Sequence, residues 1–94
     1  MSDVQQFGPD TTQMVEFNSR QRTIAMKIAI HASEHLSYQK TPPFTVNINS
    51  LIRDYMYPDL VIINNILKGE RTISKLNIEV TRDGENYYMT VKTV

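Results

Sequence analysis

The C-terminal segment 76–91 constrains the fold more than any other part of the chain, because it alternates apolar and polar residues on both sides of Asp83-Gly84. Asp-Gly favours a two-residue β-hairpin loop of type I′. A loop at these residues pairs apolar residues across the two strands: Val80 with Tyr87, Ile78 with Met89, and Leu76 with Val91. An isolated hairpin is unstable in water, so its apolar face must pack on the remainder of the chain.

The segment 47–71 has the pattern of two short amphipathic helices with an interruption at Tyr57-Pro58. Asn47 is a favourable N-cap for the first helix. The apolar residues after it recur at the spacing of one helical face: Ile48, Leu51, Ile52, Tyr55 and Met56. Pro58 ends that helix and can occupy the first turn of the next, which Gly69 closes. We therefore predict helices over residues 48–56 and 59–68.

A longer helix is predicted upstream, and it ends near residues 36–38 because the proline pair at 42–43 stops it. Two starts are open. One is Thr12, and the other is Asn18, which forms a capping-box pattern with Gln21. Residues 1–12 are polar and acidic, so we expect a flexible acidic tail there and a single domain over residues 13–94.

Residues 44–46 alternate like a short strand, which makes the predicted order helix, short strand, helix, helix and two strands. Over residues 19–94 this order resembles the winged-helix variant of helix-turn-helix domains. The resemblance implies an α+β, winged-helix-like fold with three helices, a short strand and a C-terminal β-hairpin wing. It also implies a small DNA-binding transcriptional regulator with residues 58–68 as its recognition helix. Residues 63–69 also look like the end of the recognition helix in repressor-type helix-turn-helix proteins. Arg53 and Tyr57 depart from that pattern, since those proteins commonly have a small residue and a glycine at these places.

In the major groove of DNA, the exposed face of the second short helix would present Val61, Asn64 and Asn65. Asparagine can read adenine through two hydrogen bonds, and Val61 can contact a thymine methyl group. Basic residues are the predicted phosphate contacts: Lys68, Arg71 and Lys75, with Lys40 and Arg53 beside them. The alternative interpretation is a solvated polar face or a contact with a protein.

Charge favours the alternative function, a protein-binding adaptor or inhibitor without DNA binding. Ten basic side chains are balanced by ten acidic ones, and the hairpin tip has two acids, Asp83 and Glu85, against Arg82. Phosphate repels such a tip. Met26 and Ile30 lie outside the main apolar face of the long helix, so they are the predicted homodimer contacts, unless the rest of the domain covers them.

Tyr88 is predicted on the outer face of the hairpin, where it could contact a partner or stack on a base. The chain has no cysteine and three glycines, so a thiolate nucleophile is absent and a glycine-rich nucleotide loop has nothing to form from. We therefore expect no enzyme and no cofactor. The longest nearly apolar run, residues 60–63, is too short to span a membrane, and the lack of cysteine fits a cytoplasmic protein.

His31, Glu34 and His35 spell H-x-x-E-H, the motif of inverted zinc metalloproteases. Those enzymes resemble this chain in nothing else. We interpret the three residues as part of a polar stripe, so no metal is expected and a zinc-dependent hydrolase is a distant third hypothesis.

Overall fold

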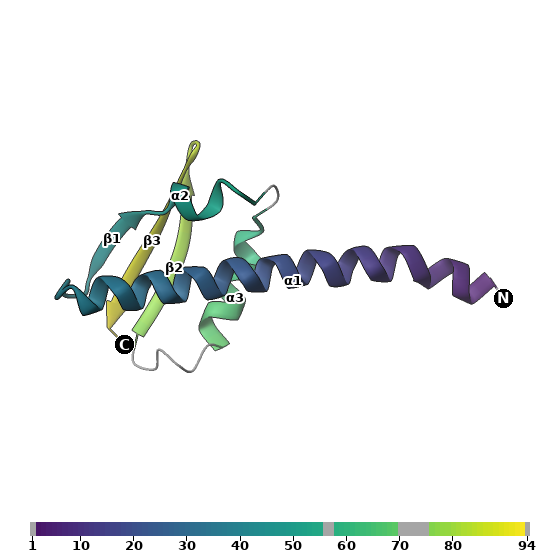
Figure 1. Ribbon diagram of the computed structural model, residues 1–94, viewed down its shortest axis with the longest axis horizontal. Helices are drawn as coiled ribbons and strands as arrows, with labels where there is room; N and C mark the ends of the chain where they lie inside the picture. The colour runs from purple at the N-terminus through teal and green to yellow at the C-terminus, as the bar shows by residue number, and fades with distance from the viewer. Residues whose placement is uncertain (1, 56–57, 70–75, 94) are drawn as a thin grey trace.

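A long helix crosses one face of a three-stranded antiparallel sheet in the part of the chain that the structure describes (Figure 1). Two shorter helices contact this long helix. The computed structural model describes residues 2–55, 58–69 and 76–93, with side chains described from residue 14 onward. The elements are α1 (Ser2–Ser37), β1 (Phe44–Asn47), α2 (Asn49–Ile52), α3 (Leu60–Gly69), β2 (Leu76–Asp83) and β3 (Asn86–Thr93). The predicted α+β class, with a short strand and a C-terminal hairpin, is confirmed.

Helix α1 begins at Ser2, earlier than both predicted starts, Thr12 and Asn18. Its 36 residues make a helix about 54 Å long, and its N-terminal part projects beyond the sheet (Figure 1). The backbone of residues 2–12 thus continues α1 where the sequence predicted a tail. The division of the chain at residue 13 stays a prediction.

The core lies between α1 and the inner face of the sheet. From α1 the buried apolar side chains are Ile24, Ala25, Ile28, Ala29 and Ala32. Across from them, the two hairpin strands bury alternate residues: Ile78, Val80, Met89 and Val91. The intervening residues of β2 are exposed, so the outer face of that strand is open to solvent. Each large aliphatic side chain buried in this way contributes about 1.5–3 kcal/mol.

Gln21 is buried within α1, and it positions the start of α3. Its Oε1 atom accepts a hydrogen bond from the backbone N–H of Asp59 at 2.8 Å. Asp59 in turn accepts a hydrogen bond from the backbone N–H of Ile62 through Oδ1, at 3.2 Å, which caps the first turn of α3. The capping-box role predicted for Gln21 is therefore wrong, because this side chain serves a different helix.

Helix α2 is a single turn, shorter than the predicted helix over residues 48–56. The N-cap residue of α2 is Ile48 and not the predicted Asn47, because the carbonyl of Ile48 accepts the first helical hydrogen bonds, and no side chain caps the helix. Asn47 lies one residue earlier, where its Oδ1 atom accepts a hydrogen bond from the backbone N–H of Asn49 at 2.9 Å. After Ile52 the chain forms a turn, in which the backbone N–H of Tyr55 donates to the carbonyl of Ile52, three residues earlier, at 2.8 Å. The predicted apolar face is nevertheless directed inward in the described residues, with Ile48 and Ile52 buried.

The sheet order is β1-β3-β2, so β3 is central and β2 is an edge strand. Val80 pairs with Met89, and Ile78 pairs with Val91. The predicted register is therefore wrong by two residues. The hairpin loop is Gly84-Glu85, and Gly84 has a φ of 64°, as the first position of a type II′ turn requires. Because side chains in a strand alternate with a period of two, this shift left every residue on its predicted face.

None of the described helices combines the length and the apolar character needed to cross a membrane.

Candidate nucleic-acid interface

Helix α3 presents three of the predicted DNA-contacting residues outward. It begins at Leu60, one residue after the predicted start, and packs through Ile63 and Leu67, which are buried. The opposite side carries Val61, with 71% of its surface exposed, together with the exposed Asn65 and Lys68. We call these three residues the outer face of α3.

Asn64 does not belong to this face, although the sequence placed it there. Its Nδ2 atom donates to the backbone carbonyl of Val80 at 3.0 Å, and its Oδ1 atom accepts from the backbone N–H of Val80 at 2.8 Å. Val80 lies on the edge strand β2, so the amide pairs with this strand as a neighbouring strand would. This pairing takes up the hydrogen-bonding edge of Asn64 that was predicted to read adenine.

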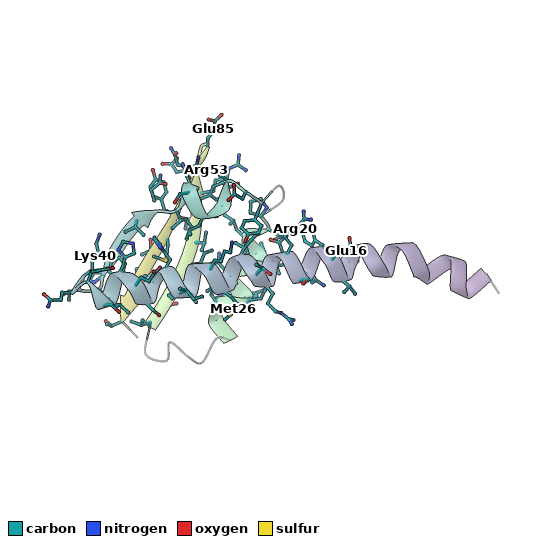
Figure 2. The ribbon with its side chains drawn as sticks, viewed as in Figure 1. Glu16, Arg20, Met26, Lys40, Arg53 and Glu85 are labelled. Carbon is teal, nitrogen blue, oxygen red and sulfur yellow. The ribbon has the colours of Figure 1, made fainter. Side chains whose placement is uncertain are left out.

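The predicted basic contacts do not gather around α3. Arg71 and Lys75 lie outside the described residues. Lys40 follows α1, with Nζ 5.5 Å from the centroid of the Phe44 ring, and Arg53 follows α2. Figure 2 shows Lys40 and Arg53 apart from each other, with Lys40 at the end of α1 and Arg53 beside α2. Within the described part of the chain, Lys68 is the predicted cation that α3 itself carries.

Arg82, the basic residue at the hairpin tip, forms its contacts within the hairpin itself. Arg82 donates through Nε to the carbonyl of Gly84 at 2.7 Å, and its guanidinium lies 5.7 Å from the centroid of the Tyr87 ring. Asp83 and Glu85 are exposed, and Figure 2 shows Glu85 at the outer end of the hairpin. A tip with two free carboxylates beside one internally bonded arginine is a poor surface for phosphate.

Asn49 joins α2 to the hairpin, and sequence reasoning missed it. Its Nδ2 atom donates to Oδ1 of Asn86 at 2.8 Å, and its Oδ1 atom accepts from the backbone N–H of Tyr87 at 2.7 Å. A hollow of about 300 Å³ lies beside this junction. It is lined by Asn49, Ile52, Arg53, Tyr55, Pro58, Glu85 and Tyr87. Its lining mixes both charges with apolar surface and indicates no particular ligand class.

On α1, Met26 and Ile30 are exposed, with 41% and 57% of their surfaces accessible, so the described residues do not cover them. They border a shallow groove of about 220 Å³ on that helix. Figure 2 shows Met26 on the opposite side of α1 from Glu16 and Arg20. Glu34 also lines the groove, so its apolar surface is bordered by a charged side chain of the same helix.

Two tyrosines have described surroundings that bear on binding. Tyr88 is half-buried and pairs with Thr81 and Asn47, so it lies on the outer face of the sheet as predicted. Lys27 places Nζ 5.1 Å from the centroid of the Tyr55 ring. A hydrogen bond to the Tyr55 hydroxyl raises the pKa of Lys27 above its usual value. Lys27 is thus a cation already engaged within the chain.

His31 and His35 lie one turn apart on α1, and their Nε2 atoms are 3.1 Å apart. Nδ1 of His31 is 3.8 Å from Oε1 of Glu34. Burial, followed by the proximity of His31 and Lys40, lowers the pKa of His35 below its usual value. Among the described residues, no cluster of three or more His, Cys, Asp or Glu side chains could hold a metal ion.

Comparison of the chain with protein-family models, with curated proteins and with solved structures finds no match.

Proposed function

We propose that this chain is a winged-helix-like domain that binds double-stranded DNA through the outer face of α3. The observation that carries the proposal is the order of elements: α2 and α3 precede a hairpin whose second strand pairs with β1. This arrangement is what the resemblance to winged-helix domains implies, and it leaves Val61, Asn65 and Lys68 free for a groove.

The side chains of the outer face of α3 suit a contact with a few base pairs of DNA. Asn65 supplies the amide that can donate to and accept from adenine, and Val61 supplies an apolar contact for a thymine methyl group. Lys68 lies in the last turn of α3 and supplies a phosphate contact. Because the described face carries one cation, binding is expected to be weak and its dependence on salt shallow, at about one charge.

A titration of fluorescently labelled mixed-sequence duplex DNA at low salt tests this proposal. We expect saturable binding, a changed base preference for Asn65→Ala, and for Lys68→Ala a salt dependence reduced by about one charge. Lys92→Ala is the matched control, because it removes another exposed lysine, from the strand β3. No binding at about 100 μM protein would exclude the proposal, since even nonspecific affinity reaches that range.

A protein-binding module is the second candidate. It is favoured by the exposed Met26 and Ile30 on α1, by the acidic hairpin tip, and by the loss of Asn64 from the outer face of α3. The partner that we propose first is a second copy of the chain, because the sequence pattern of α1 exceeds what one core contact needs.

A further inference from the structure

We propose that His31 and His35 form a binding site for a divalent transition-metal ion, with the Nε2 atom of each imidazole as ligand. Imidazole nitrogen is a common ligand of zinc, nickel and copper. The inference is independent of DNA binding, since both residues belong to α1 and neither lies on α3.

The spacing of the two nitrogens fits an ion between them. Zinc binds imidazole at roughly 2.0–2.1 Å, so two nitrogens at a tetrahedral angle lie about 3.3 Å apart. The Nε2 atoms of His31 and His35 are 3.1 Å apart. The rings are perpendicular, at 85°, with centroids 4.5 Å apart, so one nitrogen currently points at the other. A rotation of the side chains, without a change in α1, lets both lone pairs converge on one ion.

In the metal-free pair of histidines, one of the two Nε2 atoms carries a proton, and this proton must leave that atom before the atom can bind a metal ion. A contact of 3.1 Å between two imidazole nitrogens needs one N–H donor and one acceptor. With His31 protonated at Nδ1, toward Glu34, its Nε2 atom is the acceptor and His35 is the donor. Binding then requires the His35 proton to move from Nε2 to Nδ1, which changes the tautomer of a neutral ring and releases no proton.

Glu34 supplies the outer partner that metal-binding histidines commonly have. Its Oε1 atom is 3.8 Å from Nδ1 of His31, on the side of the ring away from His35. A carboxylate in this place orients the ring and makes the opposite nitrogen a better ligand. Because the Glu34 side chain is 62% exposed, it is free to close the distance to a hydrogen bond.

The site has two protein ligands among the described residues, so water completes the coordination of the ion. Affinity should follow the usual order for nitrogen ligands, with copper tightest and zinc and nickel weaker. Lys40, which lies over the Phe44 ring next to His35, opposes the ion by its charge. This arrangement supports ion binding and gives no ground for a hydrolase.

Isothermal titration of the full, untagged chain with nickel or zinc chloride at pH 7.5 tests the proposal. We expect one saturable site, an affinity at least tenfold lower for His31→Gln, and an affinity about tenfold lower for Glu34→Gln. Ser33→Ala is the matched control on the same turn of α1 and should bind as the unaltered chain does. His31→Gln keeps a polar side chain of similar length, so circular dichroism should show an unchanged fold.

Two results would overturn the proposal. One is a titration that shows no saturable binding up to millimolar metal. The other is an unchanged metal affinity in the double variant His31→Gln, His35→Gln, compared with the unaltered chain. The ring protons of the two histidines give a second readout by nuclear magnetic resonance. We expect both sets to shift or broaden together as metal is added, whereas shifts elsewhere alone would contradict a site at this pair.

Discussion

Asn64 and Asn65 are neighbours on α3, but their side chains have different partners. Asn64 forms two hydrogen bonds with Val80, whereas Asn65 is exposed. Asn64→Ala should therefore lower the free energy of unfolding by about 1–3 kcal/mol, because it leaves backbone groups of the edge strand without partners. In a domain of this size each kcal/mol lowers Tm by about 4–8 °C. Thermal denaturation followed by circular dichroism measures this, and Asn65→Ala is the control. Equal Tm values for the two variants would contradict the assignment.

Gln21 is the second residue whose partner lies far away in the sequence. Gln21→Leu keeps the volume of the side chain but removes the acceptor for the Asp59 backbone N–H, which then stays partly buried without that bond. We expect a loss of about 1–3 kcal/mol in urea denaturation. The exposed neighbour Arg22→Leu should change stability by less than about 0.5 kcal/mol. If Gln21→Leu were as stable as the unaltered chain, the docking of α3 on α1 would not depend on this bond.

At the scale of elements, the hairpin depends on the backbone conformation of Gly84. A Cβ atom there would meet no atom within 4 Å, so the cost of Gly84→Ala is conformational and comes from the φ of 64°. We expect Gly84→Ala to lower stability by about 1–2 kcal/mol and Glu85→Ala to leave it nearly unchanged. Urea denaturation compares the two. Cross-strand contacts between Val80 and Met89 in nuclear magnetic resonance spectra would check the register independently, and contacts between Val80 and Tyr87 in their place would contradict it.

At the scale of the whole molecule, the groove on α1 is where we propose that a second copy of the chain binds. If two copies meet there, Ile30→Lys places a charge in the interface and should shift the sedimentation-equilibrium mass from dimer to monomer. Val61→Lys is the matched control, since Val61 is an even more exposed apolar residue outside the groove. An unaltered chain that stays monomeric at the highest concentration measured would exclude this homodimer.

Much of the fold could be predicted because burial follows local backbone geometry. A period of 3.6 residues in a helix and of two in a strand marks the inward face whatever the exact partner is. For this reason Ile48 and Ile52 are buried as predicted, even though α2 is shorter than expected. For the same reason, Val80 and Met89 are on the predicted face in a register that was predicted wrongly.

The candidate site could be predicted only in part. The hydrogen-bond partners of its polar side chains are distant in the sequence, and the periodic pattern of apolar residues does not identify them. The sequence by itself predicted an outer face of the helix over residues 59–68 with Val61, Asn64, Asn65 and Lys68, and all of these except Asn64 lie there. Only the tertiary structure decided that Asn64 pairs with β2, that Gln21 holds the start of α3, and that Asn49 joins α2 to the hairpin. Each of these bonds joins residues 16 to 38 positions apart, and its formation depends on where packing brings the second segment.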